Sequence, residues 1–286
     1  MLCAVGDLIE DVVVQLHDGI QRDSDTPATI VRRRGGSAAN VAYFAAKLNG
    51  RSRFVGCVGA DPLGDSLVGQ LQQHHVDVQG ERRGRTGSIV VVATRDGERT
   101  MLTDRGNATS LTTSRDEWLV GVSTLHLPLY SFSDNPIAAV ARTVALSARE
   151  RDIVVSMDLS SVTLIQQLGT SLVRELLTAV QPNVLFCTRA EANAAHITSG
   201  DRFGAGLVVV KDGAHPVEVF GADQSSARFA VAPVDQVVDG TGAGDAFAAG
   251  FLDQFAHAAP TSTCVEHAAA LAARVVTRAG ATLEDT

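Results

Sequence analysis

The sequence Val238-Asp239-Gly240-Thr241-Gly242-Ala243-Gly244-Asp245-Ala246-Phe247 places small, flexible residues directly before an acidic residue and an apolar run of helical character. Glycine lets the backbone approach a ligand closely, and the free N–H groups at the start of a helix favour a bound anion. Asp245 falls in the first turn of that helix. A carboxylate beside an anion site is explained if it must accept a proton from an attacking hydroxyl. The stretch therefore predicts a phosphotransferase.

The bulk composition is that of a globular protein. The chain has 286 residues, of which 45% are hydrophobic, enough for one large α/β domain or two small ones. The net charge of -8 argues against a nucleic-acid partner. Arg32-Arg33-Arg34 is the densest basic cluster, and we interpret it as a solvated strand or loop edge rather than a targeting patch.

The four cysteines and the N-terminus point to an intracellular protein. Cys3, Cys57, Cys187 and Cys264 form no Cys-x-x-Cys pair and have no histidines at zinc spacing, so we expect reduced core residues. The N-terminal residues contain no basic start or cleavage site, and no apolar run approaches bilayer length. We expect a cytoplasmic protein with no membrane partner.

Short apolar runs alternate with longer segments of helical period, which is typical of βαβ units and a mainly parallel sheet. The expected strands are Leu2–Val5, Phe54–Val58, Thr124–Leu127, Ile153–Met157, Val184–Phe186 and Leu207–Val210. The expected helices are Ala38–Leu48, Pro62–Gln73 with Asp61 as its N-cap, Pro136–Arg149, Leu172–Val180, Ala190–His196, Ala243–His257 and Ser262–Thr277.

Two regions break this alternation and predict a flap inserted into a single domain that spans residues 1–286. The segments from about 11 to 34 and from about 86 to 104 contain strand patterns without intervening helices, and Arg95–Glu98 has the composition of a hairpin turn. A flap suits a phosphotransferase, which must exclude water from its site. An antiparallel extension of the main sheet is the alternative.

Other glycine-rich segments narrow the class of nucleotide-binding protein. The chain has neither a Gly-x-x-x-x-Gly-Lys-[Ser/Thr] segment nor a Gly-x-Gly-x-x-Gly pattern at Gly240–Gly244, which argues against P-loop and dinucleotide-binding folds. Arg34–Ala42 is glycine-rich before a helix, and its Asn40 offers an amide that can bond a hydroxyl. Val55–Gly64 combines a strand, a tight turn and a capped helix.

Taken in this order, the segments closely resemble the PfkB, or ribokinase-like, family of carbohydrate kinases. The resemblance spans nearly the whole chain, with one signature from Gly35 to Gly64 and a second, highly specific one at Asp239–Phe247. It implies an α/β fold with a doubly wound, mainly parallel sheet flanked by helices and a small β-sheet lid. It also implies ATP-dependent transfer of the γ-phosphoryl group to a hydroxyl of a sugar or nucleoside.

The resemblance also implies roles for individual residues. Asp245 matches the catalytic base, and the backbone N–H groups of the preceding residues match the anion hole: Gly242, Ala243 and Gly244. The acceptor pocket of the family is matched by Asp11, Gly35, Gly36 and Asn40. Asp7 is a weaker candidate for the acceptor pocket.

Further positions match the nucleotide and metal sites of the family. Lys211 and Gly213 resemble its nucleotide-side turn, and Thr241 lies in the phosphate motif. Asp239 and Thr241, with carbonyls from Arg278–Ala281, resemble a monovalent-cation site suited to potassium. Glu191 matches the residue that acts on magnesium through water, but Thr188 stands where the family usually has asparagine. The resemblance therefore implies ATP, Mg²⁺ and K⁺.

The sequence leaves the acceptor and the assembly open. A nucleoside kinase of the adenosine-kinase type is one alternative, and Ser37, where ribokinases proper have lysine, disfavours ribose. A non-catalytic ligand-binding protein on the same fold is a second alternative, in which Thr188 would be the first sign that the residues needed for catalysis are being lost. Arg105 is expected on the lid surface or, if the acceptor is a sugar acid, facing its acidic group. The lid strands are compatible with a homodimer through their edges or with a monomer.

Overall fold

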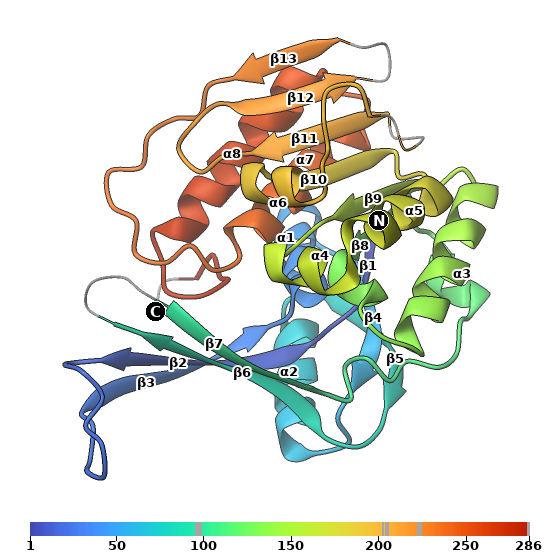
Figure 1. The fold of residues 1–286 in the computed structure, drawn as a ribbon. Helices are drawn as coiled ribbons and strands as arrows, with labels where there is room; N and C mark the ends of the chain where they lie inside the picture. The colour runs from blue at the N-terminus through green and yellow to red at the C-terminus, as the bar shows by residue number, and fades with distance from the viewer. Residues whose placement is uncertain (95–98, 202, 204–205, 222–224, 285–286) are drawn as a thin grey trace.

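The computed structural model describes residues 1–94, 99–201, 203, 206–221 and 225–284. Its centre is a nine-stranded sheet in the order β13-β12-β11-β10-β9-β8-β1-β4-β5 (Figure 1). Seven of its strands are parallel: β1 (Leu2–Val5), β4 (Ser52–Val58), β5 (Val76–Arg82), β8 (Thr124–Pro128), β9 (Val154–Asp158), β10 (Val184–Thr188) and β11 (Leu207–Lys211). The predicted α/β class with a mainly parallel sheet is confirmed.

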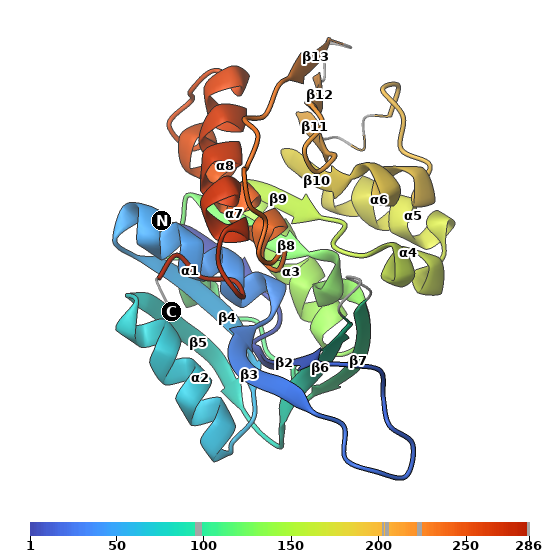
Figure 2. The same ribbon diagram turned by 90° about the vertical axis from the view of Figure 1, so that its left-hand side faces the viewer.

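Helices cover both faces of this sheet (Figure 2). On one face lie α1 (Ser37–Asn49), α2 (Pro62–Gln73), α7 (Ala243–Phe255) and α8 (Thr261–Val276). On the other lie α3 (Ile137–Glu150), α4 (Val162–Leu168), α5 (Thr170–Val180) and α6 (Arg189–Ala194). Two short 3₁₀ helices, η1 (Asp116–Leu119) and η2 (Leu129–Phe132), lie between the last lid strand and α3.

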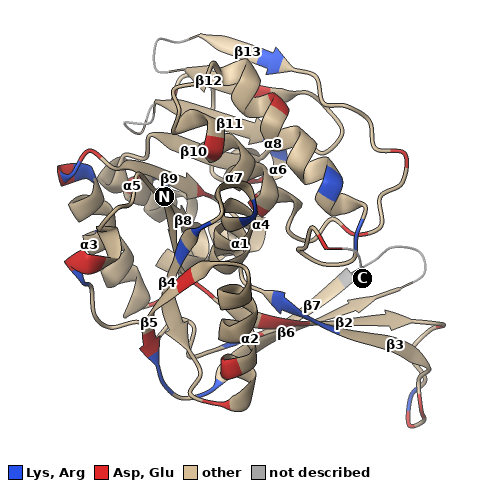
Figure 3. Ribbon diagram, turned by 180° about the vertical axis from the view of Figure 1, so that it is seen from behind, with Lys and Arg blue, Asp and Glu red and all other residues tan. Residues whose placement is uncertain are grey.

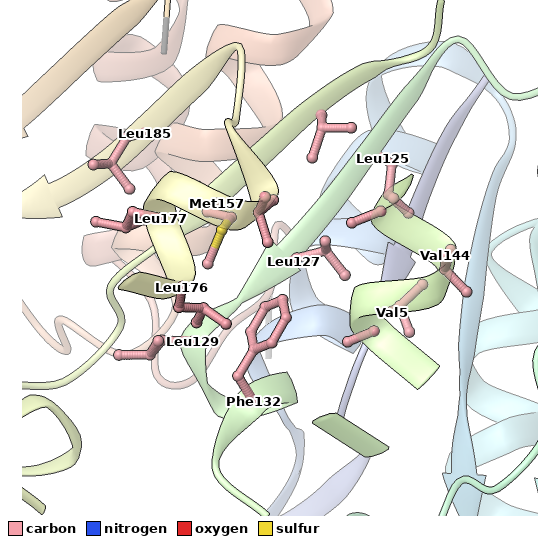
Figure 4. Packing of buried hydrophobic residues seen from close by; sticks show 14 of the residues in the cluster. Val5, Leu125, Leu127, Leu129, Phe132, Val144, Met157, Leu176, Leu177 and Leu185 are labelled. Atoms are coloured by element: carbon pink, nitrogen blue, oxygen red, sulfur yellow. The ribbon is translucent and has the colours of Figure 1, made fainter. Parts of the chain in front are cut away.

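Alternating residues of each strand serve two separate cores. Leu185 packs with the α3 and α5 side, whereas its neighbour Phe186 packs with the α7 side. Figure 4 shows the first core, in which Met157 and Leu127 lie near Leu176. Because both faces of a parallel sheet are buried, its strands read as continuous apolar runs, and this is why they were predictable.

A second sheet lies beside the first. Its order is β3-β2-β6-β7, formed by β2 (Ile9–Leu16), β3 (Ala28–Gly35), β6 (Thr86–Ala93) and β7 (Arg99–Gly106). The predicted pairs β2–β3 and β6–β7 are antiparallel, and β2 and β6 join them in parallel. A small separate sheet is confirmed, and the alternative that these strands extend the main sheet is wrong. The expected turn at 95–98 lies outside the described residues.

The main sheet nevertheless has an antiparallel edge, built by other residues. β12 (Val217–Gly221) pairs antiparallel with β11, and β13 (Ser226–Phe229) with β12. These two strands, β5 and α4 were not predicted. Most residues of β13 are exposed, and polar and apolar residues alternate along it, so this edge strand lacks the apolar run that marks a buried one.

Asp61 ties the second sheet to the helical layer. Its carboxylate accepts hydrogen bonds from the backbone N–H of Gly64, 2.8 Å away, and from the backbone N–H and hydroxyl of Thr86, at 2.7 and 2.5 Å. The first bond confirms the predicted N-cap of α2. The other two fix the first residue of β6, so one side chain sets both the start of a helix and the start of a lid strand.

The cysteines and charges agree with the expected composition of a globular chain. All four cysteines are free and buried, and burial raises the pKa of the Cys3 thiol to about 12. Acidic and basic residues are interspersed along the ribbon (Figure 3). Among the described residues, no helix combines the length and apolar character required to cross a bilayer. The cytoplasmic location stays a prediction.

Candidate active site

A cavity of about 280 Å³ lies between the lid sheet and the carboxyl ends of the parallel strands. This edge is where ligands bind in open α/β sheets. The cavity brings together residues that are far apart in the sequence, and most of the predicted site residues line it: Asp11, Gly36, Asn40, Glu191, Lys211, Thr241, Gly242, Gly244 and Asp245.

Asp245 lies in the first turn of α7, where Gly242 is the N-cap with φ 77°. Its Oδ1 accepts a hydrogen bond from the Ser37 hydroxyl at 2.7 Å, and its Oδ2 accepts one from the Asn40 amide at 2.9 Å. Part of its surface borders the cavity. Removal from bulk water raises the pKa of Asp245 to about 7, although both hydrogen bonds favour the charged form. The carboxylate is thus poised to take a proton near neutral pH.

Behind Asn40 lies Arg34, which was predicted to belong to a solvated strand edge. That interpretation is wrong for Arg34, which is 8% exposed. Its guanidinium donates to Oδ1 of Asn40 at 2.5 Å and to the carbonyl of Ala281 at 3.0 Å, and it stacks 4.5 Å above the ring of Tyr43. Burial lowers the pKa of Arg34 to about 10, so the group keeps its positive charge at neutral pH.

Lys211 reaches the cavity from the end of β11. Its Nζ donates to Oδ2 of Asp158 at 2.6 Å, and both side chains are largely buried. Burial by itself would lower the pKa of Lys211, but Asp158 and Glu191 outweigh it and raise the pKa. A β-carbon at Gly244 would lie 3.3 Å from Nζ, so the absence of a side chain there lets the ammonium approach α7. The cation therefore sits beside the helix N-terminus.

Asp158 was not among the predicted site residues. The signal was present in the sequence, because Asp158 directly follows the strand predicted at Ile153–Met157, and the carboxyl ends of parallel strands meet at one edge. A single aspartate after a strand is common in turns, however, and only the fold shows that it faces Lys211.

Thr188 and Glu191 form a capping box at the start of α6. The Thr188 hydroxyl accepts from the backbone N–H of Glu191 at 3.2 Å, and the Glu191 carboxylate accepts from the backbone N–H of Thr188 at 2.7 Å. Threonine and asparagine are both good N-caps, so Thr188 keeps the capping role at the position where asparagine was expected. Burial first, and then repulsion from Asp158, raises the pKa of Glu191.

The predicted acceptor residues meet at the lid side of the cavity. Asp11 lies directly against Gly35, where any side chain would overlap its carboxylate. Gly36 has φ 97°, and a side chain there would meet the carbonyl of Asp7. Burial, followed by repulsion from Asp7, raises the pKa of Asp11 to about 6. Both glycines are therefore required by close approach.

Asp7 and Arg105 form an ion pair inside the cavity rather than on the lid surface. Arg105 donates to Oδ2 of Asp7 at 2.9 Å and stacks 4.1 Å above the ring of Tyr130. Asp7 is 5% exposed, and its Oδ1 has no hydrogen-bond partner among the residues that the structure describes. A buried carboxylate oxygen of this kind is suited to accept a hydrogen bond from a ligand.

A second cavity of about 490 Å³ adjoins the first and is mostly apolar. It shares Thr188, Lys211 and Gly244 with the first cavity, and it also receives the predicted Gly213 and Ala243. Its apolar lining comes chiefly from β12, α7, α8 and the segment between β13 and α7: Val217, Val231, Val234, Val237, Phe247, Ala269, Ala272, Ala273 and Val276. The two cavities meet at Lys211 and the N-terminus of α7.

Asp239 joins two loops below the start of α7. Its Oδ1 accepts from the backbone N–H and hydroxyl of Thr241, at 2.9 and 2.7 Å, and its Oδ2 accepts from the backbone N–H of Gly280 at 2.9 Å. Ala281 packs against Gly242, where a side chain would overlap it. The carbonyl of Ala281 accepts the Arg34 hydrogen bond. The segment 278–282 is thereby held against the glycine-rich loop.

The mainly parallel sheet, its helical layers and the small sheet over its carboxyl edge define the ribokinase-like class of α/β folds. An adenosine kinase from Sinorhizobium meliloti has a similar structure, with a TM-score of 0.85 and 25% identity, covering 98% of this chain and 94% of that one. A fructokinase with bound ATP from Xylella fastidiosa aligns with a TM-score of 0.82 and 26% identity, covering 98% and 93%.

The sequence assigns the family within that class. The model of the pfkB family carbohydrate kinases matches residues 1–286, so the chain belongs to this family. An ATP-dependent ribose-1-phosphate kinase of Halopiger xanaduensis is 32% identical over 270 residues, which are 91% of this chain and 86% of that protein. The chain is therefore a phosphotransferase with an alcohol acceptor, an ATP-dependent kinase of a sugar or nucleoside.

Proposed function

We propose that Asp245 is the general base of this kinase and removes the proton from the acceptor hydroxyl as that oxygen attacks the γ-phosphorus of ATP. The observation that carries the assignment is the environment of its carboxylate, which is half-buried at a helix N-terminus between two donors, borders the cavity and has a pKa raised to about 7. A base with this pKa is ionised above neutral pH and still basic enough to take a proton.

The phosphoryl group would be held between the two cavities. The N-terminus of α7, from Gly242 to Gly244, would stabilise the charge that develops on the transferred group, and Lys211 would pair with the phosphates. The backbone N–H of Ala243 donates to the carbonyl of Gly240 at 3.2 Å, so Gly242 and Gly244 are the stronger candidates for the anion hole. The adenosine would occupy the larger apolar cavity, with Gly213 at its rim.

Two cations fit the residues present. Magnesium would neutralise charge on the ATP phosphates and meet Glu191 through water, because carboxylate oxygens suit Mg²⁺ and Glu191 lines the same cavity as Asp158. A monovalent cation such as K⁺ would use oxygens of the loop Asp239–Thr241 and carbonyls of residues 278–281, which Asp239 holds together.

The acceptor would lie on the lid side, with its hydroxyls bonded to Asp11, Asn40 and the unpartnered oxygen of Asp7. Gly35 and Gly36 make room for Asp11 and for the backbone of Asp7, which the acceptor would contact. Sugars and nucleosides are both candidate acceptors, because the similar proteins are kinases of adenosine, fructose and ribose 1-phosphate by name. A coupled assay of ADP release over a panel of sugars, sugar acids, sugar phosphates and nucleosides identifies the acceptor.

Asp245→Asn tests the mechanism. We expect kcat to fall by about 10³-fold, within the usual contribution of a general base. The acceptor and a non-hydrolysable ATP analogue should still raise the melting temperature of the variant, because binding of ligands to the folded state stabilises it. Retention of more than a tenth of the kcat would remove Asp245 from the proposed role.

The lid also offers a surface for assembly. Ile30 on β3 and Leu102 on β7 are 60 and 59% exposed, and these strands form the two edges of the lid sheet. Exposed apolar side chains on sheet edges favour pairing with another sheet. We therefore propose a homodimer through the lid, and analytical ultracentrifugation of the wild type and of Leu102→Lys tests it: a wild-type monomer would overturn it.

A further inference from the structure

We propose that Arg34 is a positioning residue of this kinase, which fixes the side chain of Asn40 so that its amide always presents a donor to the base Asp245. The inference rests on the proposed function of Asp245. Arg34 reaches Asn40 from β3, on the side away from the cavity, and does not itself line the cavity. It is also absent from both of the motifs that suggested the kinase.

The chemistry of the two side chains fixes the orientation of Asn40. An asparagine amide has one acceptor end and one donor end, whereas a guanidinium has donors only. Because Arg34 donates to Oδ1 of Asn40 at 2.5 Å, Nδ2 must point the other way, and it donates to Oδ2 of Asp245 at 2.9 Å. A hydrogen bond between a charged and a neutral group is stronger than one between neutral groups, which makes the orientation stable.

Without Arg34, the amide would be free to rotate. Its carbonyl end would then accept a hydrogen bond from a protonated Asp245, so the protonated form of the base would be stabilised. With Arg34 present, Asn40 can only donate to Asp245, and a charged carboxylate accepts this hydrogen bond more strongly than a neutral carboxyl does. The arginine therefore biases the base toward the state in which it can accept a proton.

The arginine itself is held rigidly. Its guanidinium stacks on the ring of Tyr43, and it donates to the carbonyl of Ala281 at 3.0 Å. The Tyr43 hydroxyl lies 3.3 Å from the hydroxyl of Thr282 and accepts from the backbone N–H of Leu283 at 3.3 Å. Residues 281–283 thus form a strap that closes over the arginine, and they couple the end of the described chain to the catalytic base.

Other charged or titratable groups also act on Asp245 and set the background for a test. Besides the donors Ser37 and Asn40 on α1, these groups are Asp158 on β9, Lys211 on β11 and Tyr130 on η2. Asp245 and Arg34 also interact directly through their charges. Loss of Arg34 removes one positive charge and leaves the other groups unchanged, so it should make Asp245 harder to ionise.

Arg34→Met is the main test variant, and Arg34→Lys is the conservative one. We expect Arg34→Met to lower kcat by about 10-fold, the size of one charge-assisted hydrogen bond. The acidic limb of its kcat–pH profile should move to higher pH by about half a unit or more, because the base is protonated more readily. KM for ATP should change by less than about twofold, because Arg34 lines neither cavity. Lysine also has donors only, so Arg34→Lys should recover part of the lost kcat and return the acidic limb most of the way to its wild-type position.

Arg32→Met is the matched control. Arg32 lies on the same strand, its side chain is 67% exposed, and it pairs with Glu10 rather than Asn40. We expect the control to leave kcat and the position of the acidic limb unchanged. If Arg34→Met has the same acidic limb as the wild type, or if Arg32→Met shifts it equally, Arg34 is not a positioning residue.

A double-mutant cycle shows whether the effect passes through Asn40. In an Asn40→Ser background, Arg34→Met should lower kcat much less than in the wild type, since no amide is left to orient. Additive losses would contradict the proposal. If Arg34→Met does not fold, the cycle is carried out with Arg34→Lys, where coupling to Asn40 again supports the proposal and additivity again contradicts it. An active Asp245→Asn enzyme would refute the proposed base, whereas an inactive one with an uncoupled Arg34 would refute only the positioning role.

Discussion

Single hydrogen bonds control the state of Asp245. The carboxylate has two donors on α1, Ser37 and Asn40, and both lower its pKa against the effect of burial. From the sequence, Ser37 was expected only to disfavour ribose as an acceptor. At this site it supports the charged form of Asp245, the proposed base, so this hydroxyl should affect the pH range of activity.

Ser37→Ala should therefore make the enzyme more sensitive to acid. Loss of the hydroxyl raises the pKa of Asp245 above its value of about 7, so kcat should fall more at pH 6 than at pH 9. Steady-state rates across this range measure the shift. Ser66→Ala, at an exposed position on α2, is the control and should follow the wild-type profile. A loss of kcat that is equal at every pH would contradict the expectation.

His126 is a second residue whose charge is set by its surroundings. It is fully buried on β8, and its Nδ1 lies 3.0 Å from the hydroxyl of Ser156, which itself donates to the carbonyl of Leu125 at 3.1 Å. The serine must therefore accept from His126, so Nδ1 carries the proton. Burial lowers the pKa of His126 to about 4, and the ring stays neutral in the folded protein.

This histidine should make the fold less stable in mild acid. Its folded pKa lies below its unfolded value, so the unfolded chain binds the proton first, and stability falls as pH drops below about 6.5. Between pH 7.5 and 5.5 the loss through this residue is about 1 kcal/mol. Urea unfolding at both pH values should show a smaller loss in His126→Leu. His215→Leu, whose side chain is 78% exposed, should behave as the wild type.

At the scale of elements, the junction of α2 and β6 depends on Asp61. Its carboxylate accepts three hydrogen bonds, one from the start of the helix and two from the first residue of the lid strand. The predicted N-cap is confirmed, whereas the contact with Thr86 leaves no local pattern in the sequence. Gly59 is also required at this junction of α2 and β6, because a side chain at position 59 would overlap Thr86.

Asp61→Ala should both destabilise the protein and loosen the lid. Loss of an N-cap costs about 0.5–2 kcal/mol, and the unpaired Thr86 groups add to this. Because β6 contributes to the acceptor cavity, KM for the acceptor should rise more than KM for ATP. Thermal melting and steady-state kinetics measure both effects. Asp65→Ala is the control, since Asp65 lies on the same helix turn, is 73% exposed and pairs at the surface with Arg82.

Elements differ in how far the sequence predicts them. The buried parallel strands and the glycine-rich loops carry local signals, since apolar runs and small residues reflect their surroundings directly. Edge strands such as Ser226–Phe229 carry only weak local signals in the sequence. The prediction for Arg34 was wrong for a different reason: its partners Asn40 and Ala281 are 6 and 247 positions away, and only the fold brings both to it. Likewise, Asp7 forms an ion pair with Arg105, which lies 98 positions later in the chain, and no local sequence pattern indicates this contact.

At the scale of the whole molecule, the two cavities proposed for the two substrates are lined by different elements. The lid sheet supplies apolar residues to the smaller cavity, among them Ile89, Val91 and Met101, whereas α7 and α8 line the larger one. Among the described residues, the two cavities have Lys211, Gly244 and Thr188 in common. Binding at each should therefore be separable by mutation.

A matched pair of cavity-filling variants tests this division. Ile89→Phe narrows the smaller cavity and should raise KM for the acceptor several-fold with little change in KM for ATP. Ala273→Phe fills part of the larger cavity and should do the reverse. Initial rates with each substrate varied in turn measure both constants. Equal effects of both variants on both substrates would show that the cavities do not hold separate substrates.

The strap at residues 281–283 has a consequence for how activity develops during folding. The contact between Arg34 and Ala281 joins residues 247 positions apart, and contacts of such long separation require closure of a large loop before they form. Single helices and neighbouring strand pairs can form before this closure, but Asp245, the proposed base, is not yet oriented. During refolding from denaturant, recovery of helical circular dichroism should precede recovery of enzymatic turnover, and the delay should disappear in Arg34→Met, whose lower activity no longer waits for the closure.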